Sequence, residues 1–185
     1  MASDGHAVGL TSAEAIDQEI AQRRTARLTL RPVAMGDLKA AYAIYSRPEV
    51  VRHRPDPVPD SKALCARRLE KEVRHWEKHD IGRWAILKDG AVIGFGGLTH
   101  KVGFFGLNLS YHLNPDHWGQ GYAQEFVSEA LAVAFGPRQA QRVIGLVRPV
   151  NTASLRVLEK AGFAKEAEVM LEGSTSLLYA RHAKG

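Results

Sequence analysis

The segment from Asn114 to Ala123 has the residue types and spacing of an anion-binding turn. It reads Asn-Pro-Asp-His-Trp-Gly-Gln-Gly-Tyr-Ala and lies between an alternating apolar run and an amphipathic helical pattern. Gly119 and Gly121 lack Cβ atoms where the backbone must turn sharply, which lets successive N–H groups point out of the N-terminus of the following helix. Such a terminus attracts anions through unpaired donors and its positive dipole end. A pyrophosphate would fit it; the alternative is a tight turn whose glycines serve geometry alone.

A second polar segment covers residues 151–163 and reads Asn-Thr-Ala-Ser-Leu-Arg-Val-Leu-Glu-Lys-Ala-Gly-Phe. Asn151 precedes a helical pattern, where asparagine is a favourable N-cap for its own reasons. Ser154 carries a hydroxyl that could donate a proton, although an exposed helical serine is the ordinary alternative. Arg156 and Lys160 could reach a phosphate or could simply be solvated.

Metal chemistry is not indicated by the sequence. His75 and His79 are four residues apart on one helical face, but they lack a third ligand and the glutamate of a zinc-protease motif, so we interpret them as surface residues. Cys65 is the single cysteine, which excludes an internal disulfide and a cysteine-based zinc site. We therefore expect no metal and a reducing, cytoplasmic setting.

Two motifs and their order carry a resemblance to a known family. Residues 118–123, Trp-Gly-Gln-Gly-Tyr-Ala, resemble the Gln/Arg-x-x-Gly-x-Gly/Ala signature of the GNAT superfamily of acetyl-CoA-dependent N-acetyltransferases. Residues 151–163 resemble that family's second segment, Asn-x-x-Ser-x-x-x-x-x-Lys-x-Gly-Phe. Residues 28–32, Leu-Thr-Leu-Arg-Pro, and the Trp-Gly pair resemble the RimJ/RimL branch, which acetylates protein N-termini, especially on ribosomal proteins. The likeness covers residues 26–180 and implies acetyl-CoA as the acetyl donor.

The resemblance also implies which residues bind acetyl-CoA. Backbone groups near Tyr111, Leu113 and Asn114 would pair with the pantetheine arm like an added strand. The phosphate loop would comprise Trp118, Gly119, Gln120, Gly121, Tyr122 and Ala123. Because Trp118 replaces the Gln or Arg that begins the general signature, the phosphates would depend on backbone donors. Asn151 would hydrogen-bond the cofactor arm, Arg156 would reach the pantetheine or a phosphate, and Ser154 is the candidate general acid for the leaving sulfur.

The general base is the open question in this reading. Asn108 occupies the position where related enzymes often place a glutamate, and an amide cannot accept a proton. A free α-amine, with a pKa near 7.7–8.0, is about a tenth neutral at pH 7, whereas a lysine at about 10.4 is neutral to only a few parts in ten thousand. A site without a strong base therefore suits α-amines, unless His112, His100 or an ordered water acts instead.

The main hypothesis is acetyl transfer from acetyl-CoA to a primary amine, most readily a ribosomal or other protein N-terminus, by direct attack in a ternary complex. One alternative is acetylation of a small-molecule amine, and another is a CoA-binding module with little catalytic activity, as Asn108 suggests. The net charge of +5 would also suit a polyanion such as RNA, but a mixed solvated surface explains it as well. Arg52 and Arg54, in a proline-rich loop, would favour acidic acceptors. A homodimer is left open.

The elements that must position these residues follow from periodicity and turn signals. The 185 residues, 45% of them apolar, suit one domain over 26–183, preceded by an N-terminal extension over 1–25 with a short helix at 12–23. No apolar run approaches the roughly 18 residues of a membrane span. The expected strands cover 27–32, 84–88, 91–99, 104–113, 142–147, 163–171 and 176–182, and the expected helices begin at 37, 60, 121 and 152.

This element order predicts a mixed α+β fold with helices on both faces of the sheet. Asp89-Gly90 between two apolar runs indicates a two-residue hairpin turn. The family resemblance implies a GNAT-like, mostly antiparallel sheet of about seven strands. It also implies that strands 104–113 and 142–147 are parallel neighbours that splay apart.

Overall fold

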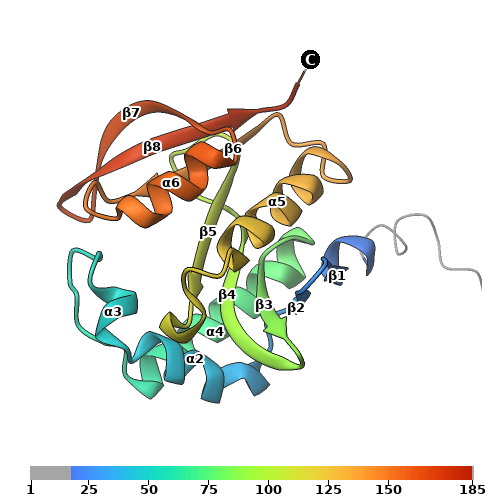
Figure 1. Ribbon diagram of the computed structural model, residues 1–185, viewed down its shortest axis with the longest axis vertical. Coiled ribbons are helices and arrows are strands. Elements are labelled where there is room, and N and C mark those ends of the chain that lie inside the picture. Colours follow the sequence, from blue (N-terminus) through green and yellow to red (C-terminus); the bar gives the residue numbers. More distant parts are fainter. Residues whose placement is uncertain (1–17, 185) are drawn as a thin grey trace, which may run out of the picture.

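The computed structural model describes residues 18–184, which form one eight-stranded sheet flanked by helices (Figure 1). The strand order is β1-β2-β3-β4-β5-β6-β8-β7, and every neighbouring pair is antiparallel except β5 and β6. The strands are β1 Arg23–Arg24, β2 Thr29–Pro32, β3 Arg83–Lys88, β4 Ala91–His100, β5 Leu107–Leu113, β6 Arg142–Val147, β7 Ala164–Leu171 and β8 Ser174–His182. The predicted mixed fold is confirmed, with one strand more than expected.

Helices cover both faces of the sheet, as predicted (Figure 1). They are α2 Leu38–Tyr45, α3 Pro48–Val51, α4 Lys62–His79, α5 Tyr122–Phe135 and α6 Thr152–Lys160, with 3₁₀ turns at Met35–Asp37 and Pro115–His117. Helices α2 and α4 pack with Phe95 on one face, whereas α5 packs on the other. The sequence did not indicate α3, which begins at Pro48 because proline suits the first helical position. Within residues 18–184, no helix is long and apolar enough to cross a membrane.

Helix α5 packs closely against the sheet at Gly96. Phe126 is fully buried and packs edge-on against Trp84, with ring centroids 6.4 Å apart. A Cβ atom on Gly96 would lie 2.6 Å from the Phe126 ring, so only glycine allows this approach. The contact fixes the axis of α5 and therefore the place of its N-terminus beside the end of β5.

Strands β5 and β6 begin as a parallel pair and then separate. Their pairing is limited to Leu107 with Val143 and Asn108 with Ile144. Beyond that point β5 stays with β4 as far as Leu113, while β6 continues along β8. The predicted splayed pair is confirmed, but β5 begins three residues later than expected. Gly106, with a φ of +98° and the Arg142 carbonyl close by, turns the chain just before it.

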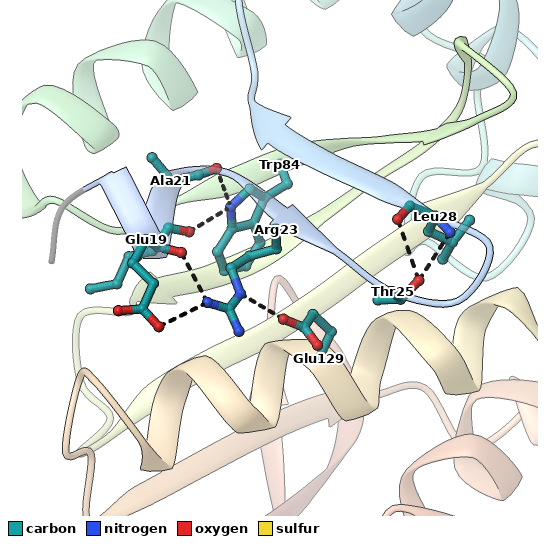
Figure 2. A network of polar contacts seen from close by, with 8 residues as sticks. Glu19, Ala21, Arg23, Thr25, Leu28, Trp84 and Glu129 are labelled. Carbon is teal, nitrogen blue, oxygen red and sulfur yellow. Dashed lines mark hydrogen bonds and ion pairs between the residues drawn. The ribbon is translucent and has the colours of Figure 1, made fainter. Parts of the chain in front are cut away.

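The segment before β2 is tied to the domain by side chains (Figure 2). Ile20 is fully buried, the Arg23 Nε lies 2.6 Å from Glu129 of α5, and the Trp84 indole donates to the Ala21 carbonyl at 3.1 Å. Residues 18–21 are helical, but the predicted helix does not extend to residue 23, because Arg23 and Arg24 pair with β2 as an added edge strand. The earlier part of that prediction, residues 12–17, lies outside the described residues.

Candidate active site

The turn before α5 has the backbone conformation that its glycines predict. Gly119 and Gly121 have φ angles of +74° and +81°, in the left-handed region that glycine adopts at little cost. Gly121 is the N-cap of α5 and offers no side chain to the first N–H groups of this 14-residue helix. A Cβ atom at Gly119 would meet nothing within 4 Å, so the backbone there faces open space. The turn therefore presents backbone donors and the positive end of a helix dipole to a ligand.

The side chain of Arg27 contacts this turn and stabilises it. Its Nη1 donates to the Gln120 carbonyl at 2.9 Å, its Nε lies 2.7 Å from Glu125, and its guanidinium carbon is 4.5 Å from the centre of the Tyr122 ring. Burial by itself would raise the pKa of Glu125, but hydrogen bonds from Thr25 and Arg27 lower it below its usual range. Arg27 thus adds a fixed positive charge beside the turn. Sequence reasoning missed it because the contact joins residues more than 90 positions apart.

A cavity of about 420 Å³, which we call the helix-side cavity, lies against this turn between β5, α5 and α6. Most of the residues predicted to bind acetyl-CoA line it: Tyr111, Leu113, Trp118, Gly119, Gly121, Tyr122, Ala123, Asn151, Ser154 and Arg156. Its other charged lining residues are Arg52, Lys160 and Glu49. With Arg156, the wall therefore holds three basic side chains against one acidic one, which suits a phosphate-bearing ligand.

Asn114 and Gln120 do not line this cavity. The Asn114 N–H donates to the Ile93 carbonyl and its side-chain oxygen accepts from the Asp116 N–H, so it stabilises the turn. The Gln120 side chain donates back to the Asp116 carbonyl at 3.2 Å. The Trp118 indole donates to the Leu113 carbonyl at 2.9 Å, which occupies one of the β5 acceptors expected to face pantetheine.

The remaining edge of β5 faces the opening between the splayed strands. Because the Asn114 N–H bonds to β4, strand alternation directs the backbone groups of Leu109 and Tyr111 toward β6. Pairing between β5 and β6 ends at Asn108 and Ile144, so these groups lie beyond the last paired residues. An extended ligand could add there as a strand would.

Asn151 and Ser154 meet at the start of α6. The Asn151 side-chain oxygen accepts from the Ser154 N–H at 3.2 Å, which is the N-cap contact that the sequence offered as the alternative to cofactor binding. This leaves the Asn151 amide NH₂ group as its donor toward the cavity. Burial raises the pKa of the Tyr111 hydroxyl, and the Ser154 side chain beside it partly opposes that rise. The two hydroxyls are therefore close neighbours on the cavity wall.

The opening connects the helix-side cavity with the other face of the sheet. A bridging cavity of about 240 Å³ shares Tyr111 and Ser154 with the helix-side cavity. It shares Arg54 and Arg148 with a far-face cavity of about 720 Å³. Asn108, at the position of the usual base, lines the far-face cavity only, among the cavities named here.

His112 lines the helix-side, bridging and far-face cavities. Its ring packs edge-on against Tyr45 with centroids 5.3 Å apart, and its Nδ1 is enclosed without a hydrogen-bond partner. Burial, reinforced by the charges of Arg83, Arg54 and Arg68, holds the pKa of His112 well below its ordinary value. The imidazole is therefore neutral at physiological pH and able to accept a proton.

The other candidate histidine, His100, lies elsewhere. It forms a cluster with His75 and His79, whose rings are 4.5 Å apart, and the His100 N–H donates to the His75 ring at 3.3 Å. Burial and the neighbouring histidines lower the pKa of His75. None of the three lines the cavities described above. Across residues 18–184, no group of three or more histidine, cysteine or acidic side chains is arranged to hold a metal.

Comparison with known proteins agrees with this geometry. Residues 27–164 match the family model described as an acetyltransferase (GNAT) domain. The chain is 29% identical over 147 residues to the uncharacterized N-acetyltransferase YoaA of Bacillus subtilis, covering 77% of this chain and 82% of that one. An acetyltransferase structure from Agrobacterium tumefaciens superposes with a TM-score of 0.76 at 27% identity, covering 89% of this chain and 95% of that one.

More distant structures share the fold with different acceptors in their names. A ribosomal-protein-S5-alanine acetyltransferase from Vibrio fischeri has a TM-score of 0.71 at 17% identity, covering 87% of this chain and 96% of that one. The aminoglycoside acetyltransferase AAC(6')-Ib, in complex with coenzyme A, has the same TM-score and identity, covering 84% and 94%. With the family model matched over most of the domain, the chain belongs to the GNAT family and is an acetyltransferase.

Proposed function

We propose that the enzyme transfers an acetyl group from acetyl-CoA to the α-amine of a protein N-terminus, as in the RimJ/RimL branch, by direct attack in a ternary complex. The observation that carries this proposal is the pair of cavities on opposite faces of the sheet, joined through the gap between β5 and β6. Such an arrangement lets a donor and an acceptor approach each other from two sides. The buried free thiol of Cys65 fits the reducing cytoplasm, where we place the reaction.

The helix-side cavity fits acetyl-CoA. The backbone donors of the Gly119–Gly121 turn would hold the pyrophosphate, with Arg156 and Lys160 adding positive charge. The edge of β5 at Tyr111 would pair with the amide groups of pantetheine. Bound there, acetyl-CoA supplies an acetyl group activated as a thioester.

The protein's part in the transfer follows from these positions. The amine nitrogen bonds to the acetyl carbon, the carbon–sulfur bond breaks, and the nitrogen gives up one proton. Backbone N–H groups on the β5 edge would stabilise the oxygen as it becomes negative, a contribution that is often large. Ser154 would donate a proton to the leaving sulfur, although a thiol with a pKa of about 8.5 is already a fair leaving group.

The charges around the far-face cavity favour a neutral or acidic acceptor over a polycation. Its lining includes Arg54, Arg68, Lys101 and Arg148 and the acidic residues Asp56, Asp60 and Glu172. Asp60 is not free to attract an ammonium group, because Arg54 lies 2.6 Å and Arg68 lies 3.3 Å from its carboxylate. Polyamines and aminoglycosides carry several positive charges and would be repelled by the net positive charge there. A peptide N-terminus need carry only one positive charge.

The test is release of free thiol from acetyl-CoA with a panel of acceptors: peptides with free N-termini, the same peptides blocked at the N-terminus, a lysine peptide blocked at its α-amine, a polyamine and an aminoglycoside. We expect release with the free N-termini, and mass spectrometry should place the acetyl group on the α-amine. Acetyl-CoA binding without thiol release from any acceptor would instead indicate a binding module. Faster release with the aminoglycoside than with every peptide would contradict the proposed acceptor.

A further inference from the structure

Two enclosed polar atoms, Arg54 Nη2 and His112 Nδ1, have no hydrogen-bond partner among the described residues. Their side chains line the same two cavities, the bridging and the far-face cavity. Asp60, whose Oδ2 also lacks a partner, lines the far-face cavity too. Buried polar groups are nearly always hydrogen-bonded, so these atoms on one cavity wall need an explanation. Arginine can only donate, whereas a neutral imidazole has one nitrogen that accepts.

The same ring positions both groups. Tyr45, the last residue of α2, packs against the His112 ring at 5.3 Å and has the Arg54 guanidinium carbon 5.6 Å from its centre. Arg54 is also held through its other terminal nitrogen, which donates to Asp60 at 2.6 Å. Arg68 Nη1 lies 3.3 Å from the second oxygen of the same carboxylate, Asp60 Oδ2, as an ion pair, although that oxygen accepts no hydrogen bond from the described residues. The guanidinium is therefore fixed with one donor left over.

We propose that Arg54 and His112 form a subsite for an α-aminoacyl group, an amine with a carbonyl or carboxylate oxygen on the adjacent carbon. The amine would donate to the His112 imidazole, and the oxygen would accept from Arg54 Nη2. This inference rests on the proposed acetyl transfer and specifies which amines the enzyme accepts. A peptide N-terminus and a free amino acid both present this group, and a simple alkylamine does not.

His112 is then the catalytic residue that receives the proton. As the nitrogen bonds to the acetyl carbon and the carbon–sulfur bond breaks, the proton leaves the nitrogen for the neutral imidazole. His112 releases it to solvent through the far-face cavity, while the sulfur takes a proton from Ser154, which regains one from solvent. Burial and the arginines around His112 lower its pKa, and the same charges disfavour an ammonium group beside it, so they favour the neutral, nucleophilic form of the bound amine.

The test compares alaninamide with isopropylamine, which has a methyl group in place of the carboxamide. Arg54→Lys keeps a positive charge for Asp60 but removes the second guanidinium nitrogen. We expect it to lower kcat/KM for alaninamide by roughly ten- to a hundredfold and for isopropylamine by less than about twofold. The difference in amine pKa between the substrates cancels, because each variant is compared with wild type on the same substrate. Arg67→Lys, at an exposed position of α4, is the matched control and should change neither value.

His112→Gln should act differently, because the imidazole contacts the amine that both substrates share. At saturating acetyl-CoA we expect kcat to fall by roughly a hundredfold or more for both. His112→Asn gives a second variant should the first unfold, and thermal unfolding of each variant checks the fold. An alanyl peptide that outperforms free alanine would identify peptide N-termini as the source of the group, and the reverse would identify free amino acids.

Two results would overturn the proposal. Arg54→Lys could leave the ratio of the two kcat/KM values unchanged, either by changing neither value or by lowering both equally. Folded His112 variants could keep the wild-type kcat. In each case thiol release by the wild-type enzyme would still support the proposed function. Absence of thiol release from wild type with every amine would overturn the proposed function and the subsite together.

Discussion

Replacing Arg27 tests whether the turn before α5 depends on a side chain from the distant loop between β1 and β2. Arg27→Met keeps an unbranched side chain and removes the guanidinium, which donates to the Gln120 carbonyl and lies over the Tyr122 ring. The Arg27 side chain is 46% exposed, so its ion pair with Glu125 contributes at most about 1 kcal/mol. The charged hydrogen bond to the carbonyl adds about 1 kcal/mol after allowance for solvent. Together they predict roughly five- to thirtyfold weaker acetyl-CoA binding.

Titration calorimetry with acetyl-CoA measures this loss directly. The backbone N–H of Arg27 still donates to Glu125 in the variant, so the segment should stay in place, and the melting temperature should fall by only a few degrees, as a loss of about 1–2 kcal/mol predicts. Because the lost charge is half exposed, the difference from wild type should shrink at high salt. Arg24→Met removes an exposed arginine from the same segment and should bind as wild type does. A folded Arg27→Met protein that binds within twofold of wild type would refute this account of the turn.

Further predictions concern the turn, α6 and the histidine cluster. Gly121→Ala forces a side chain into the left-handed region at about 1–2 kcal/mol and should weaken acetyl-CoA binding, whereas Gly90→Ala, with the same φ of +81°, should lower only the melting temperature. Asn151→Asp keeps the cap but loses the amide donor, so calorimetry should show weaker binding at an unchanged melting temperature; Asn151→Ala should also lose about 1 kcal/mol of stability. Ser154→Ala should lower kcat by more than it changes acetyl-CoA affinity. The pKa of His75 is lowered in the folded protein but is near 6.5 in the unfolded chain, so the unfolded chain binds a proton at a higher pH than the folded protein does. Urea unfolding should therefore show lower stability at pH 5.5 than at pH 7.5. This difference in stability should be smaller in His75→Gln.

Local chemistry made much of the fold predictable. The Asp89-Gly90 turn has positive φ at both residues, as its hairpin requires, and the helix over α4 begins and ends close to where its pattern predicts. Gly119 and Gly121 adopt the left-handed conformation that a donor-lined turn needs. In each case the residue type constrains its own backbone, so the signal survives in a single sequence.

Contacts between distant segments were not predictable in this way. The edge strand β1 forms because Arg23 and Arg24 find free partners on β2, yet two arginines carry no strand periodicity. The contact between Arg27 and Gln120 depends on how close α5 sits to the sheet, which Gly96 permits. Helix α3 begins at Pro48, where the sequence indicated only the end of the preceding helix.

The proposed donor and acceptor sides of the site differ in this respect for a physical reason. A pyrophosphate held by backbone N–H groups requires glycines at fixed positions, and these form a readable motif. The far side depends on ordinary side chains brought together from separate elements: Tyr45 ends α2, Arg54 follows α3, and His112 is on β5. Asn108 and His112 share one face of β5 four residues apart, which is roughly 13 Å along a strand. In the proposed mechanism the proton acceptor is His112, which lies that distance from Asn108 along the strand, on the side of Ser154. The position of the usual base therefore holds an amide that cannot accept a proton, while the site still contains a side chain that can.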